Sequence, residues 1–299
     1  MSGQAGVRAG YRCLSKPRMG LNLKGAKARS YMQSATLNSY HAHTPLPSDT
    51  FAPFDPRAYL REYYTHLGNE NRALLHFLDE AYARIFTEMS AARMLEFGGG
   101  PTIYQLISAA KYAISIDFSE YLDANLNEVQ LWLRDAHGQF FWDSFIRYVL
   151  DREGAHPHPG AVAQRRQLIR SKIERLIYCD ATKSDPLGSE FRSPYDIVSV
   201  NFVLESITTE MAEWNVFVDH VAPLVRPQGY LLMCAIMGAS YYRVGQLYFP
   251  AVPISPEIIE TKLKQQHFSV ILTHSIEAEH KDEQGYDGIF MVLAQKEPV

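Results

Sequence analysis

The chain has 299 residues, of which 46% are hydrophobic and 21% are charged, so it has the composition of an ordinary soluble globular protein and could form one large domain or two small ones. No apolar run approaches the ~20 residues of a membrane helix, and three scattered cysteines without CxxC spacing argue against a disulfide framework and for a reducing, cytoplasmic compartment. Seven Lys/Arg and no acid lie within residues 1–48, which leaves 22 basic against 33 acidic residues, or about −11, in the remainder. An acidic body repels polyphosphate, so we expect no nucleic-acid partner and no membrane partner.

Residues 1–48 lack apolar periodicity and are rich in Gly, Ser, Ala and Arg. We expect a flexible basic arm there, either simply solvated or similar to a transit peptide. The folded domain is expected over residues 49–299, as a monomer or homodimer. Its first helix is predicted to start at Asp55-Pro56, an N-terminal signal, and Tyr59, Tyr63 and Tyr64 follow on it.

Apolar runs then alternate with helical patterns. After an amphipathic helix over 70–88, we expect strands at 94–97, 112–117, 175–180, 195–202, 225–233, 268–275 and 288–294. Helices are expected at 103–110, 119–134, 163–176, 208–224 and 257–266. Residues 135–160 break the rhythm and are expected to form a loop or insertion, whose His156 and His158 we expect to be solvated rather than metal-bound. The pattern predicts an α/β fold with a seven-stranded, mostly parallel sheet.

A glycine-rich turn follows the first strand, in the segment Glu96-Phe-Gly-Gly-Gly-Pro-Thr102. Gly98, Gly99 and Gly100 allow a sharp turn and a close ligand approach before a helix start, which is typical of the first βα turn of a nucleotide-type cofactor site.

Acids end three of the strands: Glu96, Asp117 and Asp180. Asp117 lies 19 residues after Gly98, the spacing of a carboxylate that binds ribose hydroxyls, although a helix N-cap explains it equally well. Three acids oppose a pyrophosphate, and no Gly-Lys-Ser/Thr follows the glycines. A cationic nucleoside without phosphate, such as S-adenosylmethionine, fits better, and a NAD-dependent oxidoreductase is the weaker alternative.

Several motifs carry a more specific resemblance. In chain order they are Phe54-Asp-Pro-Arg-Ala-Tyr-Leu60, Gly98-Gly-Gly-Pro-Thr-Ile-Tyr-Gln-Leu106, Asn125-Leu-x-Glu-x-x-x-Trp-Leu133, Cys179-Asp-x-x-x-x-x-Pro-Leu-Gly188 and Leu224-x-Arg-Pro-x-Gly229. Together they resemble the nicotinamide, phenylethanolamine and indolethylamine N-methyltransferases, from about residue 51 to 296. The resemblance implies a class I Rossmann-like methyltransferase with an N-terminal helical lid, and S-adenosylmethionine as the methyl donor.

The resemblance also implies roles at matching positions. Tyr59 and Tyr64 would belong to the lid, and Gly98, Thr102 and Tyr104 would hold the methionine part of the cofactor. Asp117 would bind the ribose, with Asn125 in support. The adenine would lie between Asp180 and Ala181, and Asn201 would line the methionine side.

The acceptor side is less defined. The family usually has Asp-Ile-Gly-Ser-Gly where this chain has Glu96-Phe-Gly-Gly-Gly, and the Asp and Ser of the nicotinamide enzymes correspond to Cys234 and Ala251. Glu205 matches an amine-binding Glu of the phenylethanolamine enzymes, or is a helix-start acid. Tyr242 and Asp287 match pocket-lining positions.

We therefore expect methyl transfer to a small molecule, most plausibly at an amine or heteroaromatic nitrogen and without a metal. Methylation at oxygen, sulfur or carbon, and a non-catalytic binding module of the same fold, stay open as alternatives.

Overall fold

The structure, a computed structural model, describes residues 48–188, 194–279, 281 and 285–298. Seven strands form one sheet in the order β3-β2-β1-β4-β5-β9-β8. Their bounds are β1 Ala92–Phe97, β2 Ala113–Glu120, β3 Ile173–Tyr178, β4 Tyr195–Asn201, β5 Val225–Met237, β8 Phe268–Glu277 and β9 Gly288–Lys296. Neighbouring strands pair in parallel from β3 to β5, whereas β9 runs antiparallel to both β5 and β8.

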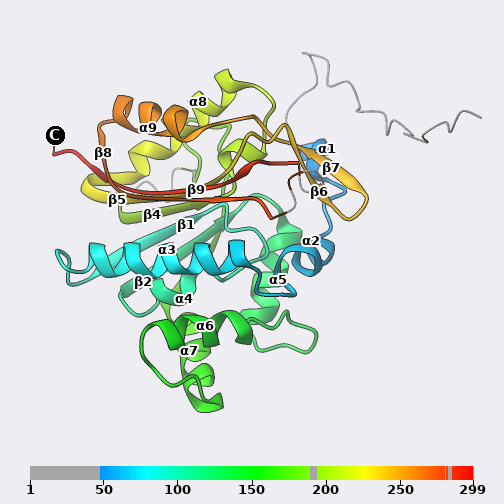
Figure 1. Cartoon of the computed structure of the whole chain (residues 1–299), viewed down its shortest axis with the longest axis vertical. Helices are drawn as coiled ribbons and strands as arrows, with labels where there is room; N and C mark the ends of the chain where they lie inside the picture. Colours follow the sequence, from blue (N-terminus) through cyan, green and yellow to red (C-terminus); the bar gives the residue numbers. More distant parts are fainter. Residues whose placement is uncertain (1–47, 189–193, 280, 282–284, 299) are drawn as a thin grey trace, which may run out of the picture. The chain divides into compact units, whose positions relative to one another are not determined.

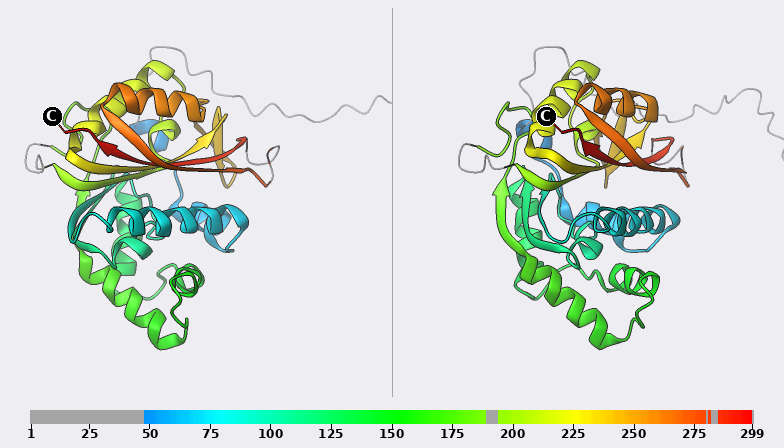
Figure 2. Two further views of the ribbon diagram at one scale, coloured as in Figure 1. Left: turned by 60° about the vertical axis from the view of Figure 1, so that its left-hand side comes forward. Right: turned by 90° about the vertical axis from the view of Figure 1, so that its left-hand side faces the viewer.

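Helices cover both faces of the sheet (Figure 1). One face packs against helices α3 Asn69–Ile85, α4 Leu106–Ala109, α5 Asp123–Leu133, α6 Asp143–Arg152 and α7 Pro159–Lys172. The other face packs against α8 Met211–Val221 and α9 Pro256–Gln265, around buried Trp214 and Phe217. The two turned views in Figure 2 keep the cyan helix α3 and the orange helix α9 on opposite sides of the sheet. Short 3-10 helices η2 Leu204–Ser206 and η3 Ala222–Leu224 flank α8.

Two smaller parts lie near the carboxyl ends of the parallel strands. Helix α1 covers Ser48–Phe51, and helix α2 covers Pro56–Tyr64, capped by Asp55, whose side chain accepts from the backbone N–H groups of Arg57 and Ala58. A hairpin of β6 Tyr241–Val244 and β7 Leu247–Pro250 stands beside α2. We refer to α2 as the lid, because its tyrosines reach over the cavity described below.

The expected seven-stranded, mostly parallel sheet is confirmed, but four local expectations are corrected. Strand β2 continues past Asp117 to Glu120, since Phe118 extends the apolar pattern. Residues 135–160 hold helix α6, whose Phe145, Ile146 and Val149 are buried. The hairpin β6–β7 was not expected, and α4 is only one turn long.

The expected basic arm falls almost wholly on residues 1–47, which lie outside the described residues. In the described part of the chain, no helix is long and apolar enough to cross a membrane.

Candidate active site

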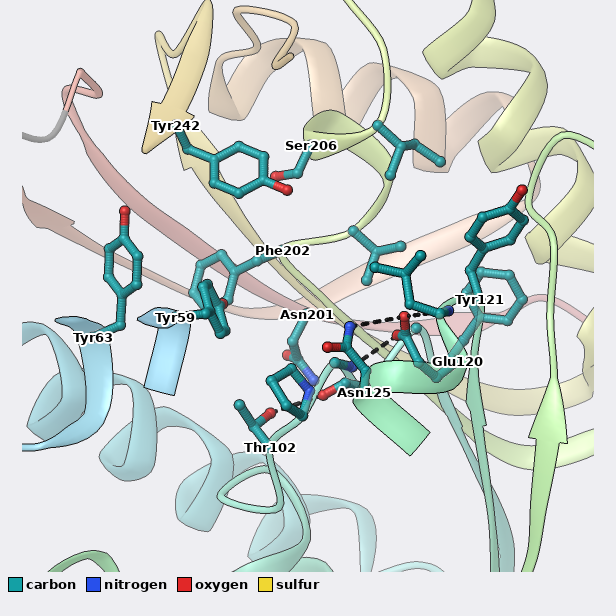
Figure 3. Close-up of a pocket in the computed structure, with 18 of the residues that line it drawn as sticks. Tyr59, Tyr63, Thr102, Glu120, Tyr121, Asn125, Asn201, Phe202, Ser206 and Tyr242 are labelled. Carbon is teal, nitrogen blue, oxygen red and sulfur yellow. Dashed lines mark hydrogen bonds between the residues drawn. The ribbon is translucent and has the colours of Figure 1, made fainter. Parts of the chain in front are cut away.

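A large cavity opens at the edge of the sheet where the parallel strands end. Its described lining comes from the lid, the turn after β1, the ends of β2 and β4, the segment after β3, strand β5, the hairpin β6–β7 and the start of β9. Figure 3 shows Glu120, Asn125, Thr102 and Asn201 on one side of this cavity, with Tyr59, Tyr63 and Tyr242 on the other. Ligands of open α/β sheets bind at this edge, so the cavity is the candidate active site.

The turn after β1 is held tightly. Gly98 and Gly100 have positive φ angles of 67° and 62°, a conformation that other residues adopt only with strain. The carbonyl of Gly99 accepts hydrogen bonds from the Thr102 hydroxyl at 2.8 Å and the Gln105 side chain at 2.9 Å. The turn is therefore fixed in a shape that brings bare backbone to the cavity wall.

Gly99 has a different reason to be a glycine. An added Cβ at this position would lie 2.3 Å from Cζ of Phe118, a ring that is fully buried on β2. A serine has no room beneath that ring, which accounts for the glycine at position 99.

Glu120 is the acid that β2 delivers to the cavity. Its Oε1 accepts from the Leu122 N–H at 2.9 Å and from Nδ2 of Asn125 at 3.0 Å, while its Oε2 accepts from the Gly100 N–H at 2.9 Å. Burial raises the pKa of Glu120, and these donors counteract the effect by stabilising the charged form. The carboxylate is thus oriented by three donors and still faces the cavity.

Two amides beside it carry unpaired acceptors. Asn201, at the end of β4, donates to Oε1 of Glu96 at 3.1 Å and to Oγ of Ser199 at 2.8 Å. Within the described structure, Oδ1 of Asn201 and Oδ1 of Asn125 are buried without a hydrogen-bond partner. A buried acceptor left unpaired costs on the order of 1–3 kcal/mol, so both point to a ligand with donor groups.

Glu96 lies behind Asn201, fully buried and outside the lining of the cavity. Burial raises its pKa to about 8, so near neutral pH the side chain carries a proton. Its function in the site is to orient Asn201 rather than to touch a ligand directly.

The segment after β3 forms a further wall. Asp180 and Ala181 both line the cavity, and Oδ1 of Asp180 accepts from the backbone N–H of Thr182 at 3.0 Å and from its hydroxyl at 2.6 Å. The other carboxylate oxygen of Asp180 is 4.0 Å from Nζ of Lys183, a side chain that is 70% exposed. Asp180 can therefore accept a further hydrogen bond from a ligand.

The lid side of the cavity is aromatic. The rings of Tyr64 and Tyr104 stack with centroids 5.3 Å apart, and the Tyr59 ring lies 5.1 Å from that of Tyr63. Burial raises the pKa of Tyr59, Tyr64, Tyr104 and Tyr242 well above the ordinary value, so these side chains stay neutral. Neutral aromatic faces attract cations.

Polar contacts fasten the lid on two sides. Arg57 pairs with Glu128 of α5 and donates to the carbonyl of Gly138 at 2.6 Å. Towards the hairpin, the Tyr63 hydroxyl donates to the carbonyl of Arg243 at 2.6 Å, and Arg243 pairs with Glu62 at 2.8 Å. The lid is thus closed over the cavity in this structure.

Most of the sequence-predicted residues meet in this cavity. The lining includes the predicted residues Tyr59, Tyr64, Gly98, Gly99, Gly100, Thr102, Tyr104, Asn125, Asp180, Ala181, Asn201 and Tyr242.

Three predicted residues do not line the cavity. Asp117 is buried in the middle of β2, where it accepts from Arg175 and from the Tyr195 hydroxyl at 2.8 Å. Glu205 is buried in η2, where its Oε1 accepts from the Ile236 N–H at 3.0 Å; burial raises its pKa to about 7. Asp287 is exposed, while its neighbour Tyr286 is buried and lines the cavity. The lining residues nearest to them in the chain are Glu120, Ser206 and Tyr286.

The main residues that the sequence reading missed are Glu120, Tyr63, Glu70, Tyr286 and Phe202. A signal for Glu120 was present, since Phe118 continues the alternation of Ile114 and Ile116 and moves the strand end onto Glu120. No sequence pattern indicates that Phe202 is a site residue. Phe202 follows β4 with a positive φ of 60°. Backbone strain of this kind gathers at functional sites.

Comparison with known proteins agrees with this geometry. The model of the NNMT/PNMT/TEMT family matches residues 43–297. Nicotinamide N-methyltransferase of Homo sapiens is 28% identical over 255 residues, covering 83% of this chain and 95% of that protein. Phenylethanolamine N-methyltransferase of Macaca mulatta is 29% identical over 263 residues, covering 83% of this chain and 91% of that protein.

A solved structure shares the fold. Magnesium protoporphyrin IX methyltransferase of Synechocystis PCC 6803 superimposes with a TM-score of 0.50 at 14% identity, over 83% of this chain and 96% of that chain. The resemblance predicted from the sequence motifs is confirmed: the chain belongs to the NNMT/PNMT/TEMT family and has the class I Rossmann-like methyltransferase fold.

Proposed function

We propose that the protein transfers a methyl group from S-adenosylmethionine to a nitrogen of a small amine or heteroaromatic compound. One observation carries the proposal: a single cavity joins a polar half built from Glu120, Asn125, Asp180 and Asn201 to an aromatic half under the lid. The matched relatives are named as nicotinamide, phenylethanolamine and indolethylamine N-methyltransferases, which supports nitrogen as the acceptor atom.

The polar half fits the donor. Oε1 of Glu120 already accepts two hydrogen bonds from the protein, whereas Oε2 accepts one and has a lone pair left that suits a ribose hydroxyl. The unpaired Oδ1 of Asn201 suits the ammonium of the methionine part, and Asp180 suits the amino group of adenine. We assign the ribose to Glu120 in place of Asp117.

The chemistry then needs little acid–base help from the protein. When bound, S-adenosylmethionine supplies an activated methyl group, and one N–C bond forms as one S–C bond breaks, leaving the thioether S-adenosylhomocysteine. A neutral nitrogen can attack directly and becomes positively charged. A methylated amine then loses an N–H proton to solvent on release, whereas a heteroaromatic nitrogen has no proton to lose and its product stays cationic. The contribution of the chain is to align the two reactants, exclude water with the lid and surround the positive charge with tyrosine faces.

The acceptor half is bounded by Tyr63, Tyr242, Tyr286 and Glu70. The carboxylate of Glu70 accepts from the Tyr286 hydroxyl at 2.7 Å and from the Glu279 N–H at 3.2 Å, which fixes it at the cavity wall. We infer that Glu70 binds a donor or cationic group of the acceptor, the role that the sequence reading gave to Glu205. The tyrosines favour a flat acceptor that packs between their rings.

The test combines calorimetry with an acceptor screen. S-adenosylmethionine and S-adenosylhomocysteine should both bind, and release of S-adenosylhomocysteine should follow with at least one heteroaromatic amine or arylethylamine. Glu70→Gln should raise KM for that acceptor by about 10-fold, the loss of one charged hydrogen bond, without changing the Kd of S-adenosylhomocysteine. The control is Glu277→Gln, because the Glu277 side chain is 89% exposed at the end of β8.

The outcomes separate the alternatives. Absence of cofactor binding would end the enzyme proposal, and binding without turnover on any acceptor would favour a binding module of the same fold. Turnover on thiols alone would move the acceptor atom from nitrogen to sulfur. The compartment proposed for this activity is the cytoplasm, which the sparse and unpatterned cysteines support.

A further inference from the structure

Three metal-ligating side chains meet outside the cavity, between helix α3 and strand β8. His76 and Glu80 are four residues apart on α3 and therefore share a face, and His274 reaches them from strand β8. Nε2 of His76 lies 3.6 Å from Oε2 of Glu80, and Nε2 of His274 lies 3.3 Å from the same oxygen. One ligand atom from each residue lies within 4.8 Å of the other two.

The distances between these ligand atoms match those of a zinc site. Zinc holds histidine nitrogen and carboxylate oxygen at about 2.0–2.2 Å in a tetrahedron, which separates neighbouring ligand atoms by roughly 3.3–3.6 Å. Both distances to Glu80 already lie within that range. We propose that His76, Glu80 and His274 bind one Zn²⁺ ion, with water in the fourth position.

The surroundings leave the cluster open to solvent. The side chains of His76, Glu80 and His274 are 42%, 44% and 33% exposed, so an ion can enter and a water molecule can complete its coordination.

The charged groups beside the cluster, on α3 and α6, form an ion pair with each other. Arg152 of α6, a cation that acts on His76, is 3.6 Å from the carboxylate of Asp79 and so has its own counter-ion. The His274 ring is oriented by the ring of Phe77, with centroids 5.6 Å apart.

The location gives the ion a structural role. Strand β8 is an edge strand of the sheet, and α3 supplies Glu70, Asn71 and Leu74 to the cavity. A bound ion would tie α3 to this edge and so hold the acceptor wall in place. The inference does not depend on the proposed methyl transfer, since no residue of the cluster lines the cavity.

The test uses the full chain, freed of metal, with ZnCl₂ in calorimetry and thermal unfolding. We expect one strong site and a higher Tm with zinc, and an affinity at least about 10-fold lower in His274→Ala and in Glu80→Gln. The matched control is His267→Ala, because His267 is 3.9 Å from Glu297 in an exposed pair without a third ligand among the described residues.

Cobalt provides a second readout on the same proteins. Co²⁺ at this site should show the visible absorption of a four-coordinate ion in the unmodified chain and in His267→Ala, and lose it in His274→Ala. Equal zinc affinity in the unmodified chain and in His274→Ala would place the ion elsewhere and overturn the proposal, as would the absence of any binding.

Discussion

Two carboxylates on strand β2, three residues apart, have opposite surroundings. Asp117 is buried and accepts from Arg175 and Tyr195, whereas Glu120 accepts from backbone and amide donors and faces the cavity. One of them therefore contributes to the fold, and the other is available to a ligand. Substitution should separate these two functions.

Glu120→Gln should weaken S-adenosylhomocysteine binding by about 10- to 100-fold, because a neutral amide replaces charged acceptor contacts worth roughly 1.5–3 kcal/mol each. Asp117→Asn should leave that affinity within about 3-fold, and instead lower the free energy of unfolding by about 1.5–3 kcal/mol. Calorimetry and thermal unfolding of both variants check the pair. Stronger loss of binding in Asp117→Asn than in Glu120→Gln would return the ribose to Asp117.

Much of the site could be predicted at the scale of single residues, because glycines, amides and strand-end acids have narrow roles. The three predicted residues that do not line the cavity each have a lining residue one to three positions away: Glu120 near Asp117, Ser206 beside Glu205 and Tyr286 beside Asp287. A residue's type does not say on which side of a strand end its side chain points. Only the backbone path settles that, and a shift of one residue reverses it.

At the scale of elements, the turn between β1 and α4 contains two glycines that are required for different reasons. A Cβ at Gly99 would collide with Phe118 at 2.3 Å, while a Cβ at Gly100 would have nothing within 4 Å but would strain a φ of 62°. Gly99 is required because Phe118 fills the space of a side chain, whereas Gly100 is required by its own backbone conformation.

Gly99→Ala should lower the free energy of unfolding by about 1–3 kcal/mol, and Gly100→Ala by about 1–2 kcal/mol. The added substitution Phe118→Leu should relieve most of the cost of Gly99→Ala and none of the cost of Gly100→Ala. Denaturant unfolding of the single and double variants measures both couplings. Equal coupling of Phe118 to the two glycines would show that the contact with Gly99 is not the cause.

Element types were easier to predict than their ends. Apolar runs identify the strands of the main sheet, but the pattern ends β2 too early and does not indicate helix α6 among the glycines and prolines of residues 135–160. The hairpin β6–β7 is short and its exposed Leu247 and Tyr248 give no alternation of burial, so its sequence carries little strand signal.

At the scale of the whole molecule, two buried acids make stability depend on pH. Burial raises the pKa of Glu96 to about 8 and that of Glu205 to about 7, from 4.5 in an exposed chain. The folded protein therefore holds protons that the unfolded chain releases. Their contribution to stability is complete below pH 4.5 and is lost as the pH rises to about 8.

The slope is at most about 1.4 kcal/mol per pH unit for each proton. Glu96→Gln and Glu205→Gln should each flatten the fall in the free energy of unfolding between pH 5 and 8, measured by denaturant titration of the ligand-free protein. Glu277→Gln, at an exposed position, should follow the unmodified chain. A variant curve parallel to that of the unmodified chain would mean that the acid is already ionised in the folded state.

Strand β9 runs opposite to the other strands of the sheet, and this decides which of its ends lines the cavity. Parallel strands reach the cavity with the residues at which they finish, as β1, β2 and β4 do. Because β9 runs the other way, it reaches the same edge with the residues at which it begins, and Tyr286 and Ile289 line the cavity there. Evolutionary change in the proposed acceptor choice can therefore act on the residues at which β9 begins. The other end of β9, which pairs with β5 and β8 in the core, can stay unchanged.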